Sequence, residues 1–314
     1  MSDSLFLKTF VDKLFESKSK TVSDKSSKDL IDSLKKDFDD NRFEKMLVIT
    51  GWIPDLYDND SSEETQYSKM IEVLVAEWGR RIGGIGECIT IKADHEDVKI
   101  SIADSAIICD AKSFRLSRSQ KAPNPKDMVK PDAFKEWGAR HTNSIGGLVT
   151  FPSTHDWKQG SVVYRDFSNK DNPIVFLSYR HLALLLHYKN KYQAEDFLKL
   201  WDYEKIFPEM LSNIKTNRSK YWDAINKAIC SIVSINMEEF NTYMNACDKE
   251  IQEAIKDYRK LIVAAKKRAI ARIKEEVNPQ NDLKQLKKEI IELRVKFETS
   301  KYTTFIDRID SFRK

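Results

Sequence analysis

Apolar residues in the first part of the chain recur every three to four positions, the period of amphipathic helices. The first such stripe consists of Leu5, Phe6, Phe10, Leu14 and Phe15. A second short helix is expected from Ser27 to Asp40. The N-terminal segment, residues 1–60, is therefore predicted to be helical.

A longer helix is predicted to begin at Ser61-Ser62-Glu63-Glu64, which has the spacing of a capping box. It extends to about Arg80, and its core-facing positions are Ile71, Leu74, Val75 and Trp78. Four of the nine glycines follow in one short turn, at positions 79, 83, 84 and 86. No Gly-Lys-Ser/Thr triplet accompanies them, so this turn is not a phosphate-binding loop.

The period then changes to alternation, which is typical of half-buried strands. Alternating apolar residues occur at Ile89, Ile91, Val98, Ile100 and Ile102. Ala106 to Cys109 is a continuous apolar run, as expected of a central strand. Gly147 to Phe151 and Ile174 to Ser178 give two further strands, and the second leads into a leucine-rich helix. A structural role is expected for His181, which lies on that helix.

From about residue 193 the pattern is helical to the end. One helix carries the stripe Ile251, Ile255, Tyr258 and Ile262; the next carries a short heptad seam, Leu283, Leu286, Ile290, Leu293 and Phe297. The seam suits dimer contacts and suits packing within one subunit equally well. The predicted fold is α/β, a small mixed sheet flanked by helices (residues 61–192) with a large helical C-terminal region (residues 193–314).

Composition supports a folded protein, because 41% of the 314 residues are hydrophobic and 32% are charged. No apolar run approaches the roughly 20 residues of a membrane span. An acid near the N-terminus, Asp3, disfavours a secretory signal, so a cytoplasmic location is expected. The four cysteines form no CxxC pair, which argues against zinc and favours buried, reduced thiols.

Candidate chemistry centres on Asp110 and Lys112, which stand two apart in a strand and so share one face. A hairpin joining Val98–Ile102 to the run at Ala106 pairs residues whose numbers have a constant sum. A sum of 207, with the turn between Ala103 and Asp104, places Asp97 opposite Asp110. Side chains paired in this way have Cβ atoms about 4.5–5.5 Å apart.

Two carboxylates this close repel each other unless a cation lies between them, and Mg²⁺ commonly takes one or two carboxylates plus waters. The metal ligands predicted are Asp97, Asp110 and the backbone carbonyl of Ala111, with Glu72 or Glu87 as a possible third acid. Lys112 is then placed to stabilise charge that develops on a phosphate. The alternative is a surface hairpin with an ordinary ion pair.

A basic segment follows this strand. From Ala111 to Lys130 there are six basic residues and one acid, although the net charge of the whole chain is only +4. The segment fits phosphate contacts, and it also fits a solvated loop. The predicted DNA contacts are Arg115, Arg118, Lys121, Asn124, Lys126, Asp127 and Lys130. Residues 256–274 carry eight basic residues and one acid, and they either grip the DNA backbone or form a solvated face beside the heptad seam.

The run Asp110-Ala111-Lys112-Ser113-Phe114-Arg115-Leu116-Ser117-Arg118 resembles that of HindIII-type restriction endonucleases in the PD-(D/E)XK nuclease superfamily. Shorter similar stretches follow in the same order: Lys126-Asp127, Phe151 to Thr154, and Ile174 to Leu186. The resemblance spans roughly residues 65–205. Where that family has a glycine before the first acid, this chain has Glu96.

The resemblance implies a PD-(D/E)XK core whose catalytic residues are Asp97, Asp110 and Lys112. It further implies a homodimer that cuts both strands of a palindromic DNA site, AAGCTT, with Mg²⁺ or Mn²⁺. A cognate DNA methyltransferase belongs to such a restriction system, with no stable complex expected. Two alternatives stay open: a repair nuclease with the same metal site and no base specificity, and an inactive DNA-binding protein.

Overall fold

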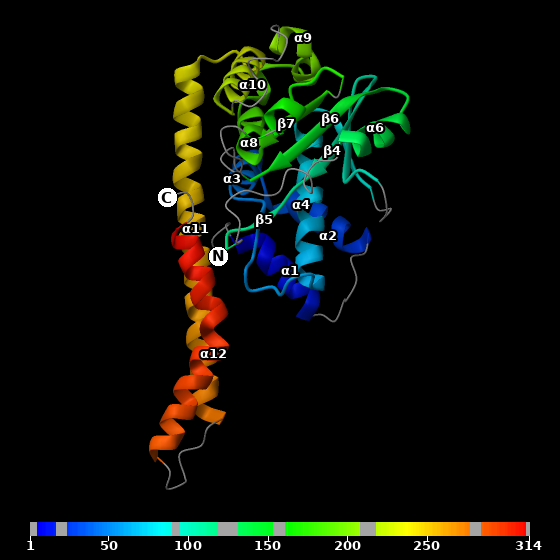
Figure 1. The fold of residues 1–314 in the computed structure, drawn as a ribbon. Coiled ribbons are helices and arrows are strands. Elements are labelled where there is room, and N and C mark those ends of the chain that lie inside the picture. Colours follow the sequence, from blue (N-terminus) through cyan, green and yellow to red (C-terminus); the bar gives the residue numbers. More distant parts are fainter. Residues whose placement is uncertain are drawn as a thin grey trace.

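The computed structural model describes residues 5–16, 24–89, 95–117, 131–152, 161, 163–171, 173–207, 218–276 and 284–311. Its centre is a five-stranded mixed sheet in the order β2-β3-β4-β6-β7 (Figure 1). The strands are β2 (Ile85–Cys88), β3 (Val98–Ile102), β4 (Ser105–Ala111), β6 (Ser144–Phe151) and β7 (Ile174–Ser178). The first three are antiparallel, whereas β4, β6 and β7 run parallel. The predicted small mixed sheet is thus confirmed.

Three helices form the N-terminal part: α1 (Phe6–Glu16), α2 (Asp24–Asp37) and α3 (Asp40–Val48). They are packed against the rest of the molecule, since α1 and α2 contact α4 and α3 contacts α8. A two-residue strand, β1 (Trp52–Ile53), pairs in parallel with β5 (Phe114–Arg115). The described residues between 5 and 60 therefore share one hydrophobic core with the sheet.

The long helix α4 (Ser62–Arg81) begins as predicted, because the Ser61 side chain accepts from the backbone N–H of Glu64. In return, the Glu64 carboxylate accepts from the backbone N–H of Asp60 at 2.7 Å. The helix lies directly on the sheet, and a Cβ atom at Gly86 would come within 1.9 Å of the Ala76 carbonyl oxygen. Only glycine permits so close an approach, which holds α4 near the hairpin.

The β3–β4 hairpin has the predicted register. Val98 pairs with Cys109 and Ile102 with Ser105, so the paired residue numbers sum to 207. The turn contains Ala103 in the left-handed region, at φ 49°. This register brings Asp97 to the end of the hairpin beside Asp110, because the chain enters β3 where β4 ends.

The leucine-rich helix α8 (Tyr179–His187) follows β7 and is almost entirely buried. His181 has a structural environment, since its Nδ1 accepts from the backbone N–H of Ser178 and its Nε2 lies 3.1 Å from Asn226 Oδ1. Burial lowers the pKa of His181 to about 3. A neutral ring that holds two neighbours in place agrees with the structural role predicted for this histidine.

The remaining helices are α6 (Pro131–Ala139), α7 (Val163–Asp166), η2 (Lys189–Lys191), η3 (Ala194–Trp201), α9 (Tyr203–Ile206), α10 (Arg218–Ile232), α11 (Met237–Glu276) and α12 (Lys284–Asp310). The last two pack side by side and extend as an arm below the sheet domain (Figure 1). The predicted stripe of α11, from Ile251 to Ile262, is buried. No helix within the described ranges is both long and apolar enough to cross a membrane.

The basic residues of α11 form part of the contact between the two arm helices. Arg259 binds Asp310 of α12 at 2.7 Å and Arg272 binds Glu298 of α12 at 2.8 Å. Lys256 and Lys260 pair with acids of their own helix. Four of the eight basic residues of this stretch are thus held in ion pairs within the arm.

Candidate active site

Asp97 and Asp110 lie together where the hairpin ends. Asp97 Oδ2 accepts from the backbone N–H of Ala111 at 3.0 Å, which fixes the carboxylate against the end of β4. The negative charge of Asp97 raises the pKa of Asp110, in addition to the larger effect of burial. Asp110 is buried, with 6% of its surface exposed. The structure therefore brings together the two acids that the hairpin register predicted.

Lys112 contacts Asp110 on the same side of the strand. Its Nζ lies 2.6 Å from Asp110 Oδ2, and its side chain remains one quarter exposed. The backbone of Lys112 is held at both ends, because its N–H donates to the Thr150 carbonyl and its own carbonyl accepts from the Tyr179 hydroxyl, each at 2.8 Å. The ammonium group is thus fixed beside an acid while still open to solvent.

Of the two glutamates considered as a third acid, Glu72 is the one whose pKa is affected by the charges of Asp97 and Asp110. Glu72 lies on α4, is 6% exposed, and binds Lys69 Nζ at 2.6 Å. Burial and the charges of Asp97 and Asp110 raise the pKa of Glu72 to about 8, although Lys69 opposes the shift. Glu87 is instead half exposed and paired with Lys99 on β3 at 2.6 Å.

The electrostatics of this group show a surplus of buried negative charge. Burial raises the pKa of Asp110 well above its usual range, and the Asp97 carboxylate raises it further, while Lys112 lowers it. Burial lowers the pKa of Lys69, but the charge and hydrogen bond of Glu72, together with the charge of Asp97, raise it overall. Buried carboxylates that repel one another are stabilised by an additional cation.

The donor set suits a hard divalent ion, since every side-chain donor in it is a carboxylate oxygen. Among the described residues, no three His, Cys, Asp or Glu side chains already stand close enough together to hold a metal. Two of the oxygens in question are bound by Lys112 and Lys69. Asp97 and Asp110 alone meet the requirement of Mg²⁺, which commonly takes one or two carboxylates.

Glu96, which precedes Asp97, faces a different partner. Its buried Oε1 lies 2.5 Å from His141 Nε2, and its Oε2 lies 3.9 Å from His95 Nδ1. The Glu96 carboxylate is therefore engaged by His141 and His95. The departure from the family's glycine at this position does not prevent Asp97 from reaching Asp110.

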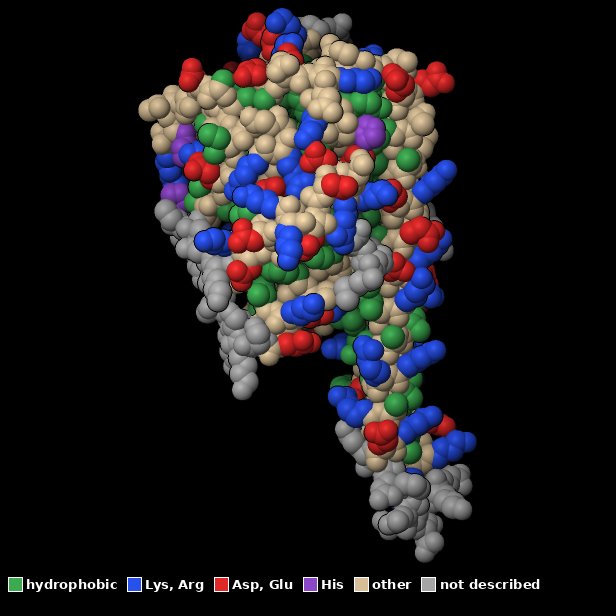
Figure 2. Space-filling view, turned by 180° about the vertical axis from the view of Figure 1, so that it is seen from behind, with side chains coloured by type: hydrophobic (Ala, Val, Ile, Leu, Met, Phe, Trp, Pro, Cys, Tyr) green, Lys and Arg blue, Asp and Glu red, His purple; other side chains and the backbone are tan. Residues whose placement is uncertain are grey.

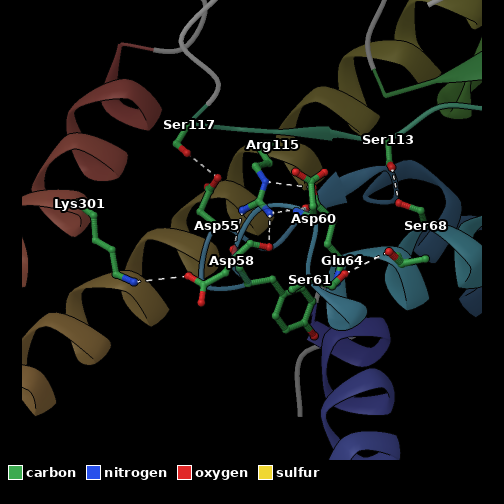
Figure 3. Close-up of polar contacts among 12 residues, drawn as sticks. Asp55, Asp58, Asp60, Ser61, Glu64, Ser68, Ser113, Arg115, Ser117 and Lys301 are labelled. Atoms are coloured by element: carbon green, nitrogen blue, oxygen red, sulfur yellow. Dashed lines mark hydrogen bonds and ion pairs between the residues drawn. The ribbon is translucent and has the colours of Figure 1, made fainter. Parts of the chain in front are cut away.

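Arg115, the first predicted DNA contact, is bound within the protein (Figure 3). Its guanidinium pairs with Glu64 at 2.8 Å and donates to the backbone carbonyls of Tyr57 and Asp58 at 2.8 and 3.1 Å. Five donors in a planar fork suit such a multiple contact. The other six predicted contacts, from Arg118 to Lys130, lie outside the described residues. Arg115 therefore lies just before the segment that contains them.

A second group of contacts holds the chain at Ser117, just before this segment. Ser117 Oγ donates to Asp55 Oδ1 at 2.5 Å (Figure 3). The Ser117 carbonyl accepts from Arg308 of α12 at 3.0 Å. Asp55 is 3% exposed, and its Oδ2 is buried without a hydrogen-bond partner among the described residues. Burial raises the pKa of Asp55 to about 6, against opposing effects of Ser117 and Arg115.

Asp55→Asn is expected to make the protein more stable at pH 8. A carboxyl whose folded pKa is about 6, against 3.8 normally, stabilises the fold fully below pH 4, and this contribution is lost as pH rises through 6. Removing the charge should raise the free energy of unfolding at pH 8 by about 1–3 kcal/mol. Urea unfolding of both proteins at pH 4.5 and 8 measures it, with the exposed Asp58→Asn as control. Equal pH slopes for wild type and Asp55→Asn contradict the prediction.

Sequence patterns alone did not identify Lys69 and Tyr179 as members of the site. Lys69 stands three residues before Glu72 on α4, a spacing that brings two side chains together on a helix. Tyr179 begins the helix after β7, and its hydroxyl reaches across to Lys112. The first contact has a local signal, whereas the second depends on how β7 lies in the sheet.

Comparison with known proteins gives two matches. The model of the HindIII restriction endonuclease family matches residues 17–298. The type II restriction enzyme HindIII of Haemophilus influenzae is 23% identical over 207 residues, which are 64% of this chain. The matched part covers 65% of that relative, slightly less than two thirds of its length.

Proposed function

Because this chain belongs to the HindIII restriction endonuclease family, we propose that it hydrolyses both strands of double-stranded DNA at a specific palindromic site. The contact that carries the proposal is the group of Asp97, Asp110 and Lys112 at the end of the β3–β4 hairpin. The mixed sheet, with the acids on its antiparallel hairpin and α4 across it, is consistent with a PD-(D/E)XK core.

The cofactor in this proposal is Mg²⁺, with Mn²⁺ as a substitute. Asp97 and Asp110 would hold it, together with the Ala111 carbonyl and Glu72 as the third acid. When bound, such an ion polarises a phosphoryl oxygen and lowers the pKa of a bound water. The raised pKa values of Asp110 and Glu72 support this assignment, because they mark carboxylates that require a cation.

Lys112 has the role of a positive charge beside the scissile phosphate. Its Nζ already lies at hydrogen-bond distance from a ligand acid and is partly exposed, so it can contact both acid and substrate. Tyr179 and Thr150 keep its backbone in place. Preorganised cations near a developing negative charge stabilise the transition state more than the ground state.

Recognition is assigned to the segment that follows Ser117. We propose that the DNA contacts of this segment are Arg118, Lys121, Asn124, Lys126, Asp127 and Lys130. Arg115 would position the start of the segment. The target AAGCTT follows from the family alone. A homodimer would match the two-fold symmetry of such a site, and a methyltransferase of the same system would protect the host DNA.

Plasmid digestion tests the proposal. The purified chain with Mg²⁺ is expected to give discrete fragments whose ends map to one palindrome, and EDTA is expected to stop the reaction. End sequencing of the fragments identifies the site. A smear of fragments would instead indicate a nuclease without base specificity, and intact DNA under all metal conditions would leave only the inactive DNA-binding alternative.

A further inference from the structure

Helix α12 carries apolar side chains on two opposite sides. One side is buried in the molecule, where Thr299 and Ile309 are each 4% exposed. The other side presents Ile290, Leu293 and Phe297, which are 48%, 68% and 83% exposed. A helix that is apolar on both sides is normally covered on both sides.

These three residues belong to the heptad seam that the sequence predicted. In the part of the seam whose side chains the structure describes, these three residues remain exposed, so they do not pack against the rest of their own subunit. In the described part of the chain, Ile85 is the one other large apolar residue that is similarly exposed, and it stands alone on the sheet domain. Figure 2 shows hydrophobic side chains reaching the surface along the arm, among Lys and Arg side chains.

We propose that Ile290, Leu293 and Phe297 pair with the same three residues of a second copy of this chain, in a parallel and in-register coiled coil. Spacings of three and four residues let one such seam interlock with its own copy. Each arm already contains two packed helices, α11 and α12, and the seam lies on the side of α12 away from α11, so two copies would place four helices side by side with the two α12 helices in contact at the centre. The proposal rests on the proposed function and names the surface of its dimer.

The charges beside the seam fit a parallel pair. Glu289 and Arg294 occupy the flanking positions on opposite sides of the seam, so a two-fold axis along the helix places Glu289 of each copy next to Arg294 of the other. Arg294 also binds Glu298 of its own helix at 2.9 Å, so in the dimer it would lie between two carboxylates. Lys296 and Lys301 give like charges at the next such positions. Both are long, solvated side chains whose repulsion costs less than the burial of three large apolar residues contributes.

The direction of the arm also favours the parallel arrangement. The seam lies in the half of α12 that is farther from the sheet domain (Figure 1). Parallel pairing leaves both sheet domains at the same end of the paired arms, where two active sites can act on one duplex. Antiparallel pairing about Leu293 would place the sheet domains at opposite ends of the paired arms.

The association state tests the surface. Leu293→Asp is expected to convert a wild-type dimer to monomers, with the dissociation constant raised about 100-fold or more, because each dimer loses two buried leucines and gains two facing charges. Sedimentation velocity across a dilution series measures it, and circular dichroism checks folding. Ile85→Asp is the matched control, since it places the same charge on an equally exposed apolar residue away from the seam, and it should leave the dimer intact.

Cysteine cross-linking tests the orientation. Ser300 occupies the next seam position, so Ser300→Cys should form an intermolecular disulfide in the parallel pair and none in an antiparallel pair centred on Leu293. Glu292→Cys, on a different side of α12, serves as the control that should stay monomeric on a denaturing gel. A dimer that survives Leu293→Asp, a wild-type monomer, or cross-linking that is equal at both positions overturns the proposal.

The nuclease assay separates this inference from the proposed function. If wild type cuts plasmid DNA and Leu293→Asp leaves the dimer unchanged, the surface is wrong and the function stands. If Leu293→Asp dissociates the dimer of a chain that cuts no DNA, the surface stands and the function is wrong. When both are right, the monomeric variant should lose double-strand cutting and accumulate nicked circles, because each subunit carries one site.

Discussion

Lys112→Ala is expected to reduce the rate of DNA cleavage by about 10²–10³-fold or more, while DNA binding stays within a few-fold of wild type. The lysine lies 2.6 Å from Asp110 and is one quarter exposed. Its loss removes the charge that the proposal places at the reacting phosphate, while the backbone bonds of residue 112 to Thr150 and Tyr179 stay in place. Single-turnover cleavage with excess enzyme measures the chemical step, and a gel-shift assay in Ca²⁺ measures binding.

Lys99→Ala is the matched control. Lys99 also pairs with a carboxylate at 2.6 Å and is also one quarter exposed, but its partner is Glu87 on the neighbouring strand. Its removal should change the cleavage rate by less than about twofold, since an exposed ion pair contributes little to stability. Equal losses in both variants would mean that Lys112 acts through the fold of the hairpin, and that the assignment of a catalytic charge is wrong.

The register of the β3–β4 hairpin could be predicted from the sequence alone. Alternating apolar residues from Val98 to Ile102 and the apolar run before Asp110 fix which faces are buried. A slip of one residue would expose all of them. Register is therefore a local property here, and the pairing of Asp97 with Asp110 follows from it. The start of α4 was equally predictable, because the capping box is contained within four residues.

Which of the two glutamates lies nearer the paired acids could not be predicted, because the answer depends on how a helix crosses the sheet. Glu72 and Glu87 both lie near the hairpin in sequence. The close approach of Gly86 to the Ala76 backbone sets where α4 lies, and with it the position of Glu72. Nothing in the spacing of Glu87 indicated that Lys99 would bind it.

For Arg115 the sequence suggested a contact with DNA, whereas the structure shows contacts within the protein. In the sequence it is one of six basic residues in a short segment, and charge alone suggests a phosphate contact. In the structure it binds Glu64 and two carbonyls of the loop before α4, because β5 pairs with β1 and brings that loop alongside (Figure 3). A pairing between strands about sixty residues apart leaves no local pattern, so the role of this arginine depended on the three-dimensional fold.

The site combines poor stability with suitability for a metal, and one substitution should separate the two. Burial and Asp97 raise the pKa of Asp110, so the metal-free fold binds this proton more tightly than the unfolded chain does. Such a group stabilises the fold at low pH, and that contribution is lost as pH rises through its folded pKa. At pH 8 without metal, the ionised carboxylate of Asp110 is therefore expected to destabilise the protein.

Asp110→Asn is accordingly expected to raise the melting temperature in EDTA at pH 8 while lowering cleavage by at least about 10³-fold. The same variant should lose the increase in melting temperature that Mg²⁺ or Mn²⁺ gives the wild type, because ligand binding to the folded state is what produces that increase. Thermal unfolding with and without metal, together with single-turnover cleavage, measures all three effects. Asp104→Asn, at the exposed hairpin turn, is the control and should change none of them.

If Asp110→Asn melted lower than wild type in EDTA and still responded to metal, Asp110 would be a structural partner of Lys112. If Asp110 is a metal ligand, Asp110→Asn melts higher than wild type in EDTA and does not respond to metal. The reason is that the ionised carboxylate destabilises the fold until a cation binds.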